Sequence, residues 1–212
     1  QELLGRGRDV NVSTFHSFCS ELLREHPDEC GVSENFTIYE DMDMAIYLHR
    51  ELGIDSKKAA HYSSSISKAK DLNLSIGDFK GYIDGKKEIL YKFGSEDGWE
   101  QLYHDYKVNL NTFHLKDKSE QKALKKEKKS WQEFIHVYDE YRKYQDFIDA
   151  WKSYEEKKSS INALDYGDLN YIALQYLDTY GTEELNDTYR YIVVDEFQDT
   201  SHAQCELLRA FI

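Results

Sequence analysis

The stretch that decides the fold lies near the end of the chain and reads Tyr191-Ile192-Val193-Val194-Asp195-Glu196-Phe197-Gln198-Asp199-Thr200-Ser201. Its first four residues are apolar or aromatic and mostly β-branched, which is typical of a short strand buried on both faces of a parallel sheet. Two adjacent carboxylates, Asp195 and Glu196, follow directly. Ligands of open α/β sheets bind outside the carboxyl ends of the strands. The pattern therefore places both acids where a binding or catalytic site is expected.

An apolar strand that ends in Asp-Glu is also the Walker B pattern of nucleotide-hydrolysing proteins. In that pattern the Asp holds the Mg²⁺ that bridges nucleotide phosphates, and a neighbouring acid orients the attacking water. The alternative is a strand that ends in a solvated acidic turn and caps the following helix. The apolar run and the two acids alone leave these interpretations evenly balanced.

The longer string Asp-Glu-Phe-Gln-Asp-Thr, residues 195–200, is more specific. It resembles motif II (DExQD) of the UvrD/Rep/PcrA family of superfamily 1 helicases. A second string, Thr14-Phe15-His16-Ser17-Phe18, resembles motif Ib of the same family and lies upstream of motif II in the expected order. A third, Leu164-Asp165-Tyr166-Gly167-Asp168-Leu169, is similar to the family's LDFxDL segment. We assign this third string a structural role, with Asp165 as a helix N-cap and Asp168 completing a capping box.

The resemblance implies ATP and Mg²⁺ as cofactors. In that case Asp195 coordinates Mg²⁺ and Glu196 is the catalytic carboxylate that activates water. Gln198 is expected near the γ-phosphate, and Asp199 in local hydrogen bonding.

Motif Ib contacts the backbone of single-stranded DNA in the family, so Thr14 and His16 are the expected DNA-binding residues. Without the resemblance, helix capping and core packing would be the favoured roles of this Thr-x-His pattern. Phe15 and Phe18 lie on the apolar stripe of the helix predicted after Thr14, and we expect them in the core.

The predicted fold class is mostly α with a small α/β part. Two strand–helix pieces of a RecA-like P-loop NTPase core (subdomain 1A) are expected at residues 1–26, with motif Ib, and 189–212, with motif II. A helical insertion similar to subdomain 1B is expected between them, at residues 27–188. The strands are expected at 10–12 and 191–194.

The chain contains no G-x-x-x-x-G-K-[ST] sequence, the loop whose amides and Lys bind nucleotide phosphates. The family's motifs III to VI and its second RecA-like domain are also absent. We therefore predict that the 212-residue chain alone does not hydrolyse ATP. The two strands would lack sheet neighbours, and unpaired edges predict self-association.

Composition limits the other possibilities. The net charge of −13 argues against a protein that coats nucleic acid non-specifically, although residues 116–129 contain seven lysines and only three acids. The three cysteines show no metal-binding spacing and indicate reduced thiols. The sequence has no apolar run of membrane-spanning length, so we expect a cytoplasmic protein without membrane contact.

The implied function is an ATP-dependent DNA helicase or translocase that acts on single-stranded DNA or on single/double-strand junctions, in DNA repair or replication. Three alternatives remain. The chain could belong to a helicase–nuclease of the RecB/AddA kind. It could be a non-catalytic interaction module. It could also be a DNA-binding module that uses Lys116–Lys129.

Overall fold

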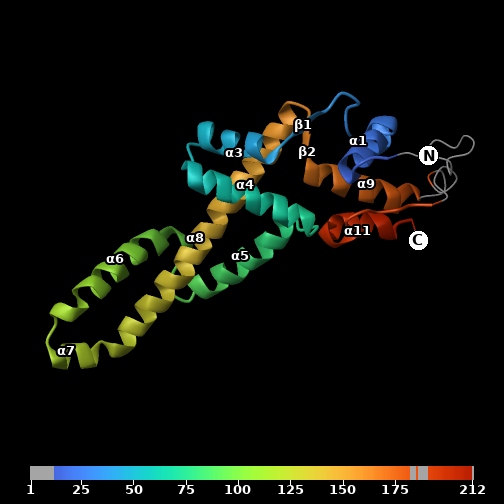
Figure 1. Cartoon of the computed structure of the whole chain (residues 1–212). Helices are drawn as coiled ribbons and strands as arrows, with labels where there is room; N and C mark the ends of the chain where they lie inside the picture. Colours follow the sequence, from blue (N-terminus) through green and yellow to red (C-terminus); the bar gives the residue numbers. More distant parts are fainter. Residues whose placement is uncertain (1–11, 182–184, 186–190, 212) are drawn as a thin grey trace, which may run out of the picture. The chain divides into compact units, whose positions relative to one another are not determined.

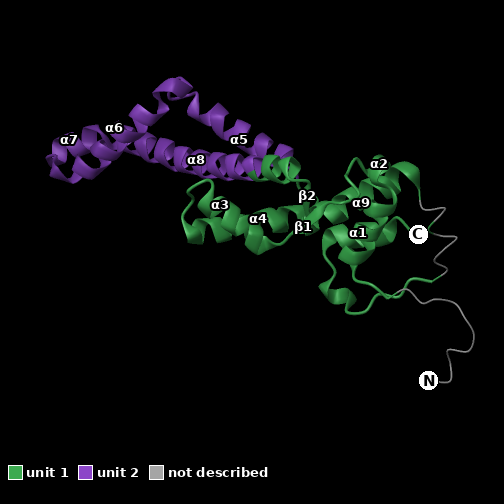
Figure 2. Ribbon diagram, turned by 90° about the horizontal axis from the view of Figure 1, so that it is seen from above, with its two compact units in different colours: residues 1–74, 154–212 green, residues 75–153 purple. Residues whose placement is uncertain are grey.

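The computed structural model describes residues 12–181, 185 and 191–211. The described residues divide into two compact units (Figure 2). Unit 1 comprises residues 1–74 and 154–212, and unit 2 comprises residues 75–153. The described residues are mostly helical and include a small parallel sheet, which confirms the predicted fold class.

Unit 1 contains eight named helices and strands among its described residues, together with a 3₁₀ turn at Phe197–Asp199 and the end of helix α8. They are α1 (Phe15–Glu25), α2 (Pro27–Cys30), β1 (Thr37–Tyr39), α3 (Asp41–Arg50), α4 (Ser56–Asp71), β2 (Ala163–Asp165), α9 (Tyr166–Tyr180) and α11 (His202–Arg209).

Helix α9 is central to unit 1 because it packs against α1, α4 and α11 (Figure 1). Apolar positions of α1, α9 and α11 meet in one core that includes Leu22, Leu169, Ala173 and Leu207, each at most 2% exposed. The helix that carries the motif Ib string and the helix that follows the motif II string are therefore both held against α9.

The sheet of unit 1 pairs two strands that are far apart in the sequence. Strands β1 and β2 run parallel, with Thr37 opposite Ala163 and Tyr39 opposite Asp165. Residues 36–39 have the composition of an extended segment, whereas residues 163–165 carry no local strand signal.

Unit 2 is built from helices. They are α5 (Ile76–Leu90), α6 (Trp99–Thr112), α7 (Lys118–Ala123) and most of α8 (Lys125–Ser160), with 3₁₀ turns at Glu96–Gly98 and Phe113–Leu115. Its core is largely aromatic and includes Trp99, Phe134 and Tyr138. The aromatic residues of α8 in this core recur three or four residues apart, which is typical of a packing seam between helices.

Helix α5 packs along α8 through edge-on aromatic pairs. The ring of Phe79 lies 5.5 Å from that of Phe147 and 5.9 Å from that of Trp151, and Tyr82 lies 4.7 Å from Tyr144. Gly81 and Gly85 lie inside α5 rather than at its ends. The packing of the helix outweighs the modest cost of glycine in a helix interior.

The predicted strand at 191–194 is wrong. These residues are not part of a strand, and Tyr191 and Val193 are 81% and 92% exposed. A strand needs a neighbour to pair its backbone N–H and C=O groups, and the described part of the chain places no strand beside this segment. Of the other predicted strand, 10–12, only Val12 is described, and it is not in a strand.

Among the described residues, no helix has both the length and the apolar character that a membrane crossing requires.

Candidate functional site

Thr14 caps helix α1. Its side-chain oxygen accepts a hydrogen bond from the backbone N–H of Ser17 at 3.1 Å, and the two hydroxyl oxygens lie 3.0 Å apart. The hydroxyl of Thr14 satisfies one of the free N–H groups of the first helical turn. The capping role considered from the sequence is therefore observed, and the side chain remains exposed.

His16 lies two residues further, at the half-buried start of α1. Its ring centroid is 4.5 Å from that of Tyr166, the first residue of α9. Burial lowers the pKa of His16, and the nearby carboxylate of Asp71 opposes this effect in part. The imidazole is thus held at the junction of α1 and α9, in surroundings that favour its neutral form.

The two acids of the motif II string are exposed. The backbone N–H of Glu196 donates to Oδ1 of Asp195 at 2.9 Å. Glu196 itself adopts a left-handed conformation with φ of 49°. Such backbone angles are uncommon outside glycine, and they concentrate at functional sites. The turn separates the two neighbouring carboxylates, which can then face different partners.

Gln198 and Asp199 lie in the 3₁₀ turn that follows. The side-chain amide of Gln198 donates to the carboxylate of Glu196. The backbone N–H of Asp199 donates to the carbonyl oxygen of Glu196 at 2.9 Å. Gln198 therefore holds the side chain of Glu196, whereas the role of the Asp199 carboxylate stays a prediction.

A cleft of about 450 Å³ brings the two motif strings together within unit 1. Thr14, His16 and Asp195 all line it, whereas Glu196, Gln198 and Asp199 do not. Most of the remaining lining is apolar and comes from residues 191–194 and helix α11. The structure thus joins three of the six predicted site residues in one cleft.

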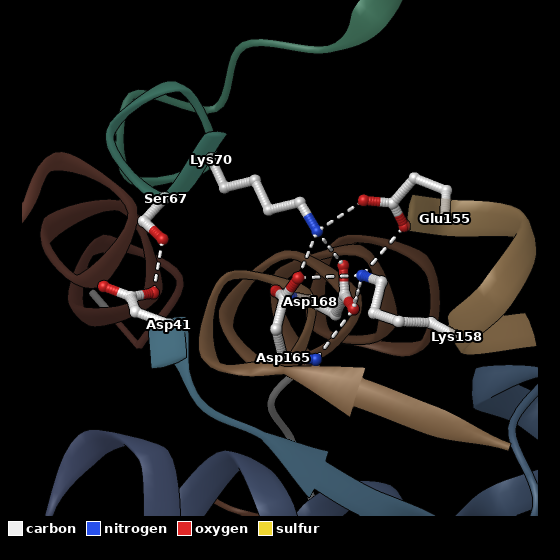
Figure 3. A network of polar contacts seen from close by, with 7 residues as sticks. All are labelled: Asp41, Ser67, Lys70, Glu155, Lys158, Asp165 and Asp168. Carbon is white, nitrogen blue, oxygen red and sulfur yellow. Dashed lines mark hydrogen bonds and ion pairs between the residues drawn. The ribbon is translucent and has the colours of Figure 1, made fainter. Parts of the chain in front are cut away.

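A second polar cluster lies in unit 1 and combines two lysines with three carboxylates (Figure 3). Lys70 Nζ lies 2.6 Å from Asp165 Oδ2, 2.7 Å from Asp168 Oδ1 and 2.8 Å from Glu155 Oε1. Lys158 Nζ contacts the same three side chains, at 2.8 Å from both Asp165 and Glu155. The cluster ties α4 and α8 to the start of α9.

Charge and burial oppose one another in this cluster. The side chains of Lys70 and Lys158 are only 10% and 2% exposed. Burial alone would raise the pKa of Asp165, but the ammonium groups of Lys70 and Lys158 outweigh burial and lower it to about 2. Burial would likewise lower the pKa of Lys70, but its carboxylate partners raise it well above the ordinary value. Lys70 and Asp165 are therefore both held in their charged forms.

Glu155, Asp165 and Asp168 offer oxygens that lie close enough together to hold a cation. The two ammonium groups already take that place, because each of the three carboxylates accepts from both lysines. The chemistry of this cluster is structural rather than catalytic. The capping box predicted for Asp165 and Asp168 is confirmed, with reciprocal bonds of 3.0 and 2.9 Å.

Gly167 fits the same arrangement. A Cβ at this position would lie 2.6 Å from both Cβ and Cδ of Lys70, closer than side-chain carbons approach one another. The residue in the middle of the Leu-Asp-Tyr-Gly-Asp-Leu string must therefore be small because the Lys70 stem crosses it.

Sequence reasoning did not identify Lys70, Lys158 and Glu155 as partners of the capping box. Lys158 and Glu155 are spaced i, i+3 on α8, which is the one local signal that they act together.

The whole chain is similar to known proteins. The profile of the family described as "UvrD/REP helicase N-terminal domain" matches residues 1–212. A probable DNA helicase II homolog of Mycoplasma pneumoniae is 29% identical over 205 residues, which cover 95% of this chain and 22% of that protein. A probable DNA helicase II homolog of Mycoplasma capricolum is 27% identical over 201 residues, 93% of this chain and 21% of that protein.

The ATP-dependent DNA helicase PcrA of Staphylococcus aureus is 25% identical over 217 residues, 99% of this chain and 22% of that protein. No solved structure matches the chain. The chain thus spans about a fifth of the length of these curated relatives. Because the family profile matches it from end to end, the chain belongs to the UvrD/REP helicase family, as part of the N-terminal domain.

Proposed function

We propose that the chain is the motif II part of an ATP-dependent DNA helicase or translocase that moves on single-stranded DNA and couples ATP hydrolysis to duplex unwinding. The observation that carries the proposal is the Asp-Glu-Phe-Gln-Asp-Thr string at 195–200, in a chain matched by the helicase family over its whole length. DNA repair or replication is the process in which such an activity would serve.

Asp195 is the proposed Mg²⁺ ligand. Its carboxylate is exposed and accepts only the Glu196 N–H among the hydrogen bonds described, which leaves oxygen lone pairs for a cation. Mg²⁺ favours such sites, with one or two carboxylates plus phosphate oxygens and water. The residue therefore fits the metal, which when bound to ATP would neutralise phosphate charge.

Glu196 is the proposed catalytic carboxylate that orients and activates the attacking water. Gln198 holds the Glu196 carboxylate through its amide, which supports a place for Gln198 near the γ-phosphate. Asp199 is proposed to act by local hydrogen bonding. The left-handed backbone of Glu196 supports a functional role for this turn.

Thr14 and His16 are the proposed contacts to the backbone of single-stranded DNA, including the strand at a single/double-strand junction. Both line the cleft beside the motif II string. A neutral imidazole and a hydroxyl can each donate a hydrogen bond to a phosphate oxygen.

The proposed division remains 1–26 and 189–212 for the RecA-like pieces and 27–188 for the insertion. Unit 2, residues 75–153, lies inside the proposed insertion.

The test compares E196Q with E206Q in a polypeptide that carries this chain together with a P-loop. E196Q should lower DNA-stimulated ATP hydrolysis by about 10²- to 10⁴-fold, the usual contribution of a general base. ATP binding should persist. Glu206 lies in α11 and is ion-paired with Arg209, so its variant should retain activity.

The 212-residue chain itself should show no ATP hydrolysis, because it lacks the phosphate-binding loop. Hydrolysis by this chain that E196Q abolishes would contradict that expectation. Equal activity of E196Q and wild type in the longer polypeptide would refute the role of Glu196.

A further inference from the structure

A basic groove lies in unit 2, where the Phe113–Leu115 turn, helix α7 and the start of α8 meet. Its volume is about 840 Å³. Six of the ten lining residues are lysines: Lys118, Lys122, Lys125, Lys126, Lys128 and Lys129. We call this feature the lysine groove. Such a concentration of positive charge is notable in a chain whose net charge is −13.

Two of the three acids in residues 116–129, Asp117 and Glu120, are engaged in capping helix α7. Asp117 caps α7, since its Oδ1 accepts from the N–H groups of Ser119 and Glu120 at 2.8 and 2.9 Å. Glu120 reaches back and accepts from the N–H of Asp117 at 3.3 Å. Within the described ranges, none of the six lysines is ion-paired with a carboxylate. Their charges are therefore available to an external anion.

The position of these lysines also works against local stability. Lys125, Lys126, Lys128 and Lys129 occupy the first turns of α8. The positive end of the helix dipole disfavours cations there, and Lys125 and Lys129 form a like-charge pair at i, i+4. Sequences that break local rules in this way commonly do so at functional sites. An anion in the groove would relieve both repulsions.

We propose that the lysine groove binds the phosphodiester backbone of a nucleic acid, as a site additional to Thr14 and His16. The one aromatic ring in the lining, Phe113, is covered by Lys128, whose Nζ lies 4.3 Å from the ring centroid. The ammonium group of Lys128 thus occupies one face of this ring. Binding is electrostatic and independent of base sequence.

The test measures the binding of fluorescein-labelled oligonucleotides of about 20 nucleotides, a length that exceeds typical single-strand site sizes. A single strand and a duplex of mixed sequence are compared in fluorescence anisotropy titrations from about 50 to 200 mM salt. The groove variant is K122Q/K125Q/K126Q/K129Q. The matched control is K57Q/K68Q/K80Q/K92Q, which removes the same number of charges from exposed lysines outside the groove.

We expect the groove variant to weaken binding about tenfold or more at low salt, and to reduce the slope of log K against log salt by about three to four, roughly one per lysine. The control should change both quantities much less. Circular dichroism checks that both variants keep their helices. The tighter of the two oligonucleotides identifies the form of nucleic acid that the groove prefers.

Equal losses in the groove variant and the control would overturn the proposal, because they would reflect net charge alone. Displacement of the oligonucleotide by an equal charge of polyglutamate would also overturn it, since the groove would then accept any polyanion. The proposal is separable from the function proposed above: loss of binding in H16A with no loss in the groove variant would support the motif Ib contact and refute the lysine groove.

Discussion

At the scale of single residues, the pair Lys70 and Lys158 shows how this fold tolerates buried charge. An ammonium group that leaves water without partners is costly, and each of these lysines instead meets three carboxylates. A buried ion pair stabilises a fold little more than apolar residues of the same volume would. Removal of one partner, however, leaves the other charge buried and uncompensated. Burial of these charges is thus compensated only while all five side chains of the cluster are present.

K70M should therefore destabilise unit 1 strongly. The variant keeps the stem of the side chain and removes its charge, so three carboxylates face the single ammonium of Lys158. We expect the free energy of unfolding to fall by about 3–5 kcal/mol. Urea denaturation, monitored by hydrogen exchange at the backbone amides of α9, measures this loss.

K86M is the matched control. Lys86 pairs with Glu140 at 2.5 Å, but their side chains are 19% and 33% exposed. Loss of this more exposed pair should cost about 1 kcal/mol or less. A similar loss in K70M and K86M would contradict the special role of the buried cluster.

The buried cluster also predicts a pH dependence. Because the lysines lower the pKa of Asp165 from its ordinary value of 3.8 to about 2, this carboxylate stabilises the fold fully above the unfolded pKa. That contribution is lost as the pH falls from about 4 towards about 2. In K70M the pKa of Asp165 in the folded state is higher than in the wild type. Acid should therefore lower the free energy of unfolding of the variant by a smaller amount. The difference in unfolding free energy between wild type and K70M should shrink over this pH range, as urea titrations at each pH would show.

Gly167 gives a further prediction at this scale. G167A places a methyl group 2.6 Å from two carbons of the Lys70 stem, and one of them is the Cβ, which cannot move without its helix. Overpacking of this kind costs about 1–3 kcal/mol. Thermal unfolding should show a lower midpoint for G167A. The control G81A has open space at the new Cβ inside α5 and should be neutral or slightly stabilising.

At the scale of helices and strands, local signals gave much of the fold. The N-caps Thr14, Asp165 and Ser201 act through side-chain acceptors and neighbouring N–H groups only, so residue type and spacing predict them. Local signals are less precise at α3, where Asp41 also has the residue type of a cap but Glu40 and Asp43 form the capping box.

Features that depend on distant residues could not be read from the sequence. Three residues at 163–165 form a strand only because residues 37–39 lie beside them. The segment 191–194 has the composition of a strand but is not in one, because composition cannot supply the neighbouring strand. In the candidate site, the sequence indicated residue types and motif spacing. The Gln198–Glu196 contact and the shared cleft required coordinates.

The cap of α1 allows its structural and functional roles to be separated. T14A removes the acceptor for the Ser17 N–H and should cost about 1 kcal/mol. T14N retains a capping oxygen and should restore stability. S201A removes the equivalent cap of α11 at a similar cost. Only the Thr14 variants should weaken single-stranded DNA binding; a loss in S201A equal to that in T14A would point to a general effect of helix fraying.

At the scale of the whole molecule, the apolar surface of residues 191–194 favours association. Val193 is 92% exposed and Ile192 is 47% exposed, next to an apolar cleft. Contiguous apolar surface and segments able to add to a strand promote contact between copies. We predict concentration-dependent self-association, and V193K should reduce it because a lysine opposes burial.

Sedimentation velocity over a range of concentrations measures this effect. V108K is the control, since Val108 is an apolar residue on α6, in unit 2, that is 57% exposed. The role of residues 191–194 in association would be refuted by a chain that stays monomeric at every concentration. It would also be refuted if V108K reduced association as much as V193K.

The antiparallel packing of α5 on α8 also affects how the molecule folds. Unit 1 is assembled from two separate lengths of chain, and unit 2 is the long loop that joins them. The Phe79–Trp151 contact brings the first and last parts of that loop within 5.9 Å of one another. Closing a long flexible loop carries an entropic cost that grows with its length. Once unit 2 is folded, the two halves of unit 1 meet as if joined by a short tether. Folding of unit 2 thus lowers the entropic cost of assembling unit 1. Lys70 then meets its three carboxylate partners at a high effective concentration.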